Sequence, residues 1–174
     1  MAKWLNDLFN EYLQEELEEN IYDGSISNKQ INVGEIYFGS LKTLNENKPN
    51  KPLYFLVVDK VDDDLYEVLK VSDHHLFATN SDVILDIGTM TVMIETANNF
   101  YLTSEEISKF IPIHKISEEE LNKILAFRDG HQSNLKTGFT PIFEDDIRNK
   151  FKKEEFNQIK EFHGRIFEIL DEDE

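Results

Sequence analysis

The segment Lys51-Pro52-Leu53-Tyr54-Phe55-Leu56-Val57-Val58 contains a continuous apolar run at residues 53–58. Successive side chains of a β-strand point to opposite faces of the sheet, so a run that is apolar at every position is apolar on both faces. Such a strand is stable only where both faces are covered. The segment therefore predicts a central strand of a sheet that has packing on both sides.

Similar short runs, rich in β-branched and aromatic residues, occur on both sides of this segment and predict further strands. They lie at residues 36–38, 65–71, 83–87, 89–94 and 100–102. Polar residues that favour turns separate them, and we interpret residues 98–99 as the tip of a hairpin. Consecutive strands at this spacing predict an antiparallel sheet that curls into a small β-barrel.

Helical patterns occupy both ends of the chain. Apolar residues recur at helical spacing from Trp4 to Leu17, and Ser104 and Ser117 are placed to cap two further helices. Residues 147–170 predict two more helices, or one kinked helix. The fold class is therefore α+β, a strongly curved antiparallel barrel flanked by helices. Its predicted parts are an N-terminal amphipathic helix (1–24), a barrel domain with closing helices (33–128) and a C-terminal helical extension (142–174).

The charge of the chain restricts its partners. The 174 residues include 18 Lys and Arg against 35 Asp and Glu, which gives a formal net charge of −17. A surface of this charge disfavours direct binding to nucleic acid and to anionic membranes, and it attracts basic proteins. An acidic surface also simply keeps a protein soluble and monomeric, so the charge alone leaves both interpretations open. The oligomeric state is left open as well.

The chain contains no cysteine, which excludes disulfides, thiolate nucleophiles, Cys-ligated zinc and iron–sulfur clusters. It has no glycine-rich phosphate-binding loop, and we expect no cofactor. The acidic N-terminal stretch has no continuous apolar region, so it resembles neither a secretory signal nor a membrane span. We therefore expect a cytoplasmic protein.

Two clusters of polar residues are candidates for chemistry. Asp73-His74-His75 combines two imidazoles with a carboxylate. In other proteins this combination binds zinc or transfers protons. Adjacent histidines point apart on a strand, however, and no HxH or HExxH spacing accompanies them, so we predict no metal site. Asp62-Asp63-Asp64 lacks the alternating ligands of a calcium loop, and we interpret it as a solvated turn.

Two segments resemble the opening of the MazF/PemK toxin family. Val33-Gly34-Glu35-Ile36-Tyr37 is similar to the first strand of that family, and the segment from Lys51 to Val58 is similar to its Arg-Pro dipeptide and following hydrophobic strand. The resemblance covers about residues 33–128 and implies a small barrel. It also implies, as an alternative function, an endoribonuclease in which Lys51 and Ser72 occupy the catalytic positions.

The chain departs from that family at the first catalytic position. Lys51 stands where the family has arginine, and an ammonium group cannot replace the two parallel donors of a guanidinium. A ribonuclease also needs a basic groove for RNA, which the net charge of −17 disfavours. We therefore expect a toxin-like barrel that no longer cleaves RNA, with no catalytic residue.

The leading hypothesis is a non-enzymatic regulatory protein that binds and sequesters a basic, nucleic-acid-binding protein such as a sigma factor, a toxin or a defence nuclease. Carboxylates would compete for the Lys and Arg side chains that otherwise bind phosphate, and aromatic residues of the C-terminal helices would add apolar contacts. The predicted partner-binding residues are Glu11, Glu15, Glu18, Asp62, Asp63, Asp64, Phe151 and Phe162. Besides the ribonuclease, the remaining alternative is an acidic inhibitor that mimics DNA.

Overall fold

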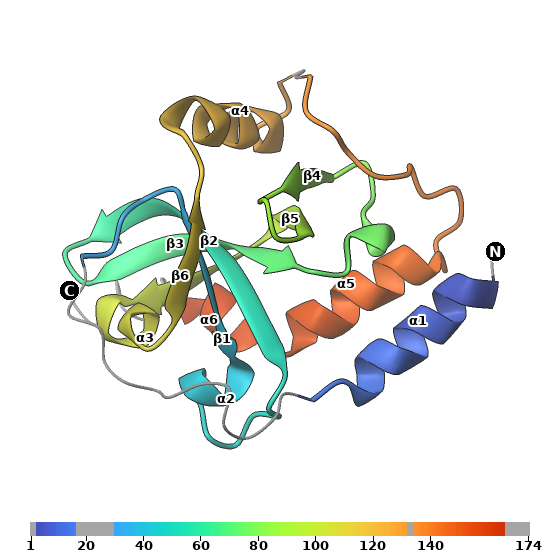
Figure 1. Cartoon of the computed structure of the whole chain (residues 1–174), viewed down its shortest axis with the longest axis horizontal. Helices are drawn as coiled ribbons and strands as arrows, with labels where there is room; N and C mark the ends of the chain where they lie inside the picture. The colour runs from blue at the N-terminus through green and yellow to red at the C-terminus, as the bar shows by residue number, and fades with distance from the viewer. Residues whose placement is uncertain (1–2, 17–29, 132–133, 166–174) are drawn as a thin grey trace.

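The structure is a computed structural model, and it describes residues 3–16, 30–131 and 134–165. It is an α+β protein in which six antiparallel strands form one curled half-barrel, in the order β4-β5-β3-β2-β1-β6 (Figure 1). The strands are β1 Glu35–Ser40, β2 Pro52–Asp62, β3 Leu65–Ser72, β4 Asp82–Asp86, β5 Thr91–Thr103 and β6 Ile111–Lys115. The predicted fold class is confirmed.

Helices lie before, between and after the strands. They are α1 Lys3–Gln14, α2 Leu41–Leu44, α3 Ser104–Ser108, α4 Glu118–Arg128, α5 Ile147–Asn157 and α6 Lys160–His163, with a short 3-10 helix, η1, at His75–Phe77. The predicted helix over 1–24 is too long, because α1 ends at Gln14 and residues 15–16 are not helical. Residues 17–24 and the last part of the predicted 142–174 extension lie outside the described residues. None of the described helices is long and apolar enough to span a membrane.

The central position of β2 follows from its sequence. Tyr54, Leu56 and Val58 pack into an apolar cluster that includes Leu121 and Ile124 of α4. The alternate residues, Leu53, Phe55 and Val57, pack on the opposite face with Ile107 of α3 and Phe162 of α6. Both faces of β2 are therefore covered, as residues 53–58 predict.

The terminal helices pack against the sheet and do not stand away from it. A third apolar cluster joins Leu5 and Tyr12 of α1 to Ile147 and Phe151 of α5 and to Met93 of β5. Figure 1 shows α1 and α5 side by side, at one end of the half-barrel. Their apolar stripes are therefore used mostly within the chain.

The strand at 91–103 differs from the prediction. Residues 98–99 do not form a hairpin tip, because they lie inside the single strand β5. Leu69 of β3 pairs with Asn99, and the next residue, Lys70, pairs with Glu95, so the register shifts by a bulge of residues 96–98. The Asn-Asn pair thus lies at a β-bulge, and a bulge accepts the same turn-forming residues as a hairpin tip does.

Candidate functional site

Lys51 and Ser72 lie at the same end of the sheet, because β2 begins where its antiparallel neighbour β3 ends. Both are buried, with 9% and 1% of their surface exposed. The Lys51 ammonium donates a hydrogen bond to the Tyr12 carbonyl oxygen (2.5 Å) and lies 4.4 Å from the centroid of the Tyr12 ring. The C-terminal end of α1 therefore covers the position where the family resemblance places catalysis.

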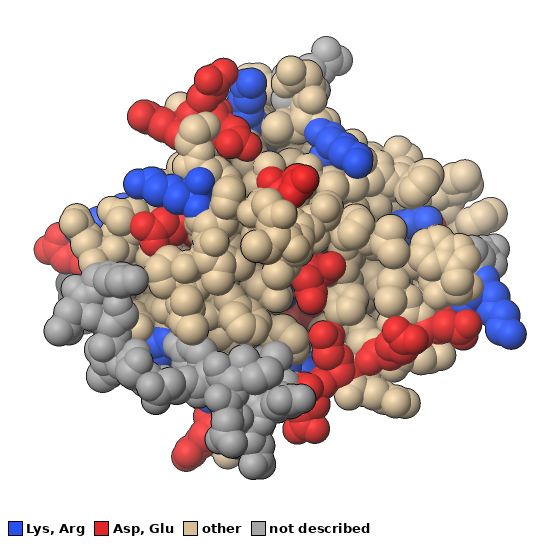
Figure 2. Space-filling model, viewed as in Figure 1, with Lys and Arg blue, Asp and Glu red and all other residues tan. Residues whose placement is uncertain are grey.

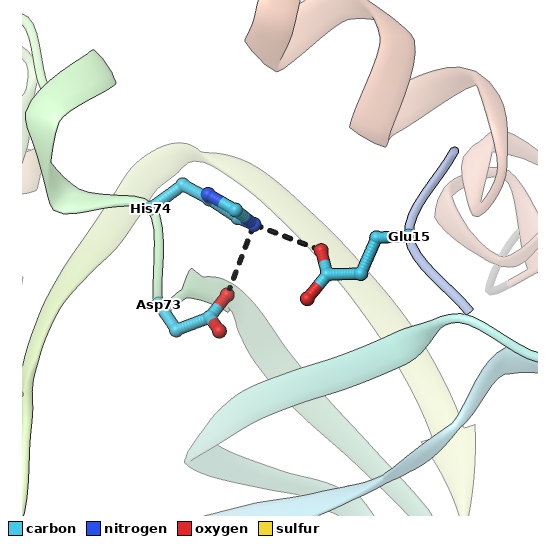
Figure 3. A group of neighbouring side chains, drawn as sticks. All are labelled: Glu15, Asp73 and His74. Atoms are coloured by element: carbon cyan, nitrogen blue, oxygen red, sulfur yellow. Dashed lines mark hydrogen bonds and ion pairs between the residues drawn. The ribbon is translucent and has the colours of Figure 1, made fainter. Parts of the chain in front are cut away.

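Next to Ser72, three side chains meet at one point (Figure 3). The Nε2 atom of His74 lies 2.9 Å from Oε2 of Glu15 and 3.5 Å from Oδ1 of Asp73. All three side chains are partly buried, and Glu15 comes from the residues just after α1. The Asp73-His74 pair is thus completed by a carboxylate that is remote in the sequence.

The electrostatics of this cluster is that of one imidazole between two carboxylates. Burial disfavours the charged imidazole, but the hydrogen bond to Glu15 and the charge of Asp73 outweigh it and raise the pKa of His74. The His74 hydrogen bond lowers the pKa of Glu15. Burial raises the pKa of Asp73, and the nearby charge of Glu15 adds to this effect. The cluster carries more negative than positive charge.

A second polar group lies deeper, between the sheet and α5. Lys70 of β3 donates to Oε2 of Glu155 on α5 (3.1 Å) and to the Val71 carbonyl oxygen (2.6 Å). Glu95 of β5 is fully buried beside them. Among the described residues, Oε2 of Glu95 and Oε1 of Glu155 have no hydrogen-bond partner. A proton on Glu95, whose pKa burial and the neighbouring Glu155 both raise, would supply a donor between these two carboxyl groups.

Burial, followed by the charge of Glu155, raises the pKa of Glu95 well above its ordinary value of 4.5. The folded state holds the Glu95 proton more tightly than the unfolded state does. The contribution of this proton to stability is therefore complete below pH 4.5 and is lost as the pH rises through the raised pKa. We therefore expect the urea midpoint of Glu95→Gln, which mimics the protonated form, to fall less than that of the wild type between about pH 5 and pH 8. The exposed Glu105→Gln is the control, and equal slopes for Glu95→Gln and the wild type would contradict the assignment.

Lys152 of α5 makes a second buried contact with the sheet. Its ammonium lies 3.0 Å from Oδ2 of Asp82 and 2.6 Å from the Thr79 hydroxyl oxygen. The Thr79 backbone N–H donates to the same Asp82 oxygen at 2.8 Å. Together with Lys70 and Glu155, this contact fixes α5 in one position on the half-barrel.

An apolar hollow of about 500 Å³ lies between α1 and the segment before α5. Three large side chains at its border are well exposed: Phe139 (70%), Ile142 (85%) and Phe143 (65%). Leu5, Asp145, Asp146 and Arg148 also line it. The Arg148 guanidinium lies 3.2 Å from Oδ1 of Asp146 and 5.0 Å from the Phe139 ring centroid. We call this surface, defined by Phe139, Ile142 and Phe143, the apolar hollow.

The segment that carries Phe139 is fixed by backbone contacts. Thr137 and Phe139 form isolated bridges with Val83 and Thr79. Gly138 lies between them, where a Cβ atom would be 2.0 Å from the Ala78 carbonyl oxygen, so only glycine fits. The backbone that carries Phe139 is therefore held against the residues before β4.

The predicted partner-binding residues fall into four groups. Glu11 and the turn residues Asp62, Asp63 and Asp64 are exposed, and Figure 2 shows a line of acidic side chains over α1. Glu15 is half-buried in the cluster with His74, and Glu18 lies outside the described residues. Phe151 and Phe162 are 0% and 5% exposed, so in this conformation neither presents its ring to a partner.

Two features of the site escape sequence reasoning. The apolar hollow lies in a loop without helical or strand periodicity, and the only signal for it is the isolated apolar group Ile142-Phe143 among polar residues. The approach of Glu15 to Asp73 and His74 has no local signal, because it depends on how α1 packs. The chain matches no protein-family model, and no curated protein matches it significantly.

Proposed function

We propose that the protein is a non-enzymatic regulator that binds and sequesters a basic, nucleic-acid-binding protein such as a sigma factor, a toxin or a defence nuclease. The observation that carries the proposal is the apolar hollow, where three large apolar side chains are 65–85% exposed beside carboxylates. Exposed apolar residues gathered around a concave surface with a polar rim are typical of protein-binding sites.

The charge around the hollow supports a basic partner. Glu144 and Asp145 are exposed in the segment that forms it, and Asp7 and Glu11 are exposed on α1. With a net charge of −17, the field of the whole molecule attracts a cationic protein and speeds its encounter. Carboxylates would bind the Lys and Arg side chains of the partner, while the hollow would receive one of its apolar side chains.

The same features weigh against the two alternatives. A ribonuclease needs its lysine and hydroxyl group accessible to RNA, whereas Lys51 and Ser72 are buried and Lys51 is bonded to the Tyr12 carbonyl oxygen of α1. An inhibitor that only mimics DNA needs the line of carboxylates over α1 but has no use for a hollow lined by Phe139 and Phe143. We therefore favour a protein that binds through both charge and apolar contacts.

The double substitution Ile142→Ser/Phe143→Ser tests this proposal. We expect the tagged wild type to retain basic proteins from a lysate of its own organism at about 0.1 M salt and to lose most of them at about 0.5 M. The double variant should retain at least about tenfold less, a loss of about 1.4 kcal/mol in binding free energy. Quantitative mass spectrometry of the eluates measures both effects.

The matched control is Ile111→Ser/Ile113→Ser, which removes two exposed apolar side chains from the edge strand β6 (46% and 37% exposed). It should retain the partner as the wild type does, and circular dichroism should show that both variants are folded. Equal retention by the two double variants, or a retained set without basic proteins, would contradict the proposal.

A further inference from the structure

The cluster of Glu15, Asp73 and His74 has the geometry of a cation site (Figure 3). One ligand atom from each residue, an imidazole nitrogen and two carboxylate oxygens, lies within 4.8 Å of the other two. The 2.9 Å and 3.5 Å separations from Nε2 of His74 are close to those between neighbouring ligands of one small cation, whose bonds are about 2.0–2.2 Å long. Small adjustments would bring all three atoms to one ion.

We propose that Glu15, Asp73 and His74 bind one divalent first-row metal ion, with Zn²⁺ as the best match. One imidazole and two carboxylates are ligands that zinc accepts, whereas magnesium and calcium prefer oxygen ligands alone. This inference uses residues separate from the apolar hollow and does not depend on the proposed function.

The surroundings of His74 hold its ring in place for binding. Its centroid lies 5.4 Å from that of Tyr12, 5.5 Å from that of Phe151 and 6.4 Å from that of Phe77. Its backbone N–H donates to the Ser72 hydroxyl at 3.1 Å. A ligand fixed by its packing loses little conformational entropy when it binds a metal, so the site is preorganised.

The charge of the cluster also favours a cation. Two carboxylates lie against the same imidazole nitrogen, Nε2 of His74, and the nearby Lys51 ammonium is bonded to the Tyr12 carbonyl oxygen. A divalent ion would neutralise both carboxylates, in a molecule whose net charge of −17 concentrates cations around it. The side chains of Glu15 and Asp73 are about one-third exposed, which leaves coordination positions open to water.

The bound ion would join two parts of the fold. Glu15 follows α1, and Asp73 and His74 follow β3, so coordination would fasten the end of α1 over the sheet. A metal that binds only the folded state raises stability by mass action, in proportion to the logarithm of its concentration above the dissociation constant. The melting temperature should therefore rise with added Zn²⁺.

Isothermal titration of the metal-free 174-residue chain with ZnCl₂ tests the site. We expect saturable binding of one Zn²⁺, weakened at least about tenfold in each of Glu15→Gln, Asp73→Asn and His74→Gln. The neighbours Glu16→Gln and His75→Gln are matched controls, because they remove the same chemical groups one residue away and should bind as the wild type does. The absence of saturable binding, or equal losses in the ligand variants and their controls, would overturn the proposal.

A second measurement needs no variant. The imidazole NMR signals of the five histidines can be followed during titration of the wild type with ZnCl₂. We expect the signals of His74 to change first and to saturate at one equivalent. If those of His75, His114, His131 or His163 change instead, the proposed site is wrong.

Discussion

Replacing Lys70 with alanine should lower the free energy of unfolding by about 3–5 kcal/mol. Its ammonium group is fully buried and bonds Glu155 of α5 (3.1 Å) next to the buried Glu95. Without Lys70, two carboxyl groups remain in the interior with no cation to compensate them, and this loss is much larger than that of an exposed ion pair. Urea unfolding at pH 7, followed by circular dichroism, measures the change.

Two further variants separate the loss of the buried pair from the loss of any lysine. Lys60→Ala removes an exposed lysine from β2 and should change stability by no more than about 0.5 kcal/mol. Lys70→Met/Glu155→Met replaces the pair with apolar side chains and should be more stable than Lys70→Ala, because no unpaired charge remains at either position. If the double variant is the less stable of the two, the loss in Lys70→Ala does not come from leaving a buried charge unpaired, and this explanation is wrong.

The sequence predicts the sheet well where local pattern and tertiary packing agree. Residues 53–58 are apolar at every position, and the structure covers β2 on both faces. Ser117 accepts a hydrogen bond from the Glu120 backbone N–H, as a helix-capping serine should, and α4 ends at Arg128, just before Gly130 with its positive φ of 94°. These signals depend on near neighbours in the chain, which a single sequence contains.

Other features depend on contacts between distant residues, and local pattern cannot supply them. Asn98 and Asn99 have the composition of a hairpin tip, but Leu69 of β3 pairs with Asn99 and keeps the strand continuous through a bulge. The cap of α3 is a different kind of error, because Thr103, one residue before the predicted Ser104, caps the helix through local contacts with Glu106. Turn-forming residues therefore indicate where a strand is irregular. Whether the irregularity is a hairpin tip or a bulge depends on the pairing with the neighbouring strand.

The buried charges are the clearest case of this limit. Lys70 and Glu95 interrupt apolar strands, and nothing in their local sequence distinguishes a buried charge from one on a solvated face. Their burial becomes visible only when α5 brings Glu155 against them. In the same way, Glu15 reaches His74 only because Tyr12 and Phe151 pack α1 on α5.

Replacing Phe151 with alanine should lower the free energy of unfolding by about 3–5 kcal/mol, the usual cost of truncating a fully buried phenylalanine. The Phe151 ring is 0% exposed, stacks on Phe77 with centroids 4.1 Å apart and contacts Tyr12 edge-on at 4.6 Å. Phe143→Ala is the matched control, because that ring is 65% exposed and its loss should change stability by no more than about 0.5 kcal/mol. The two variants thus separate the aromatic residue that holds α1 and α5 to the sheet from the one proposed to contact a partner. Equal urea midpoints for Phe151→Ala and the wild type would mean that this aromatic cluster contributes little to the fold.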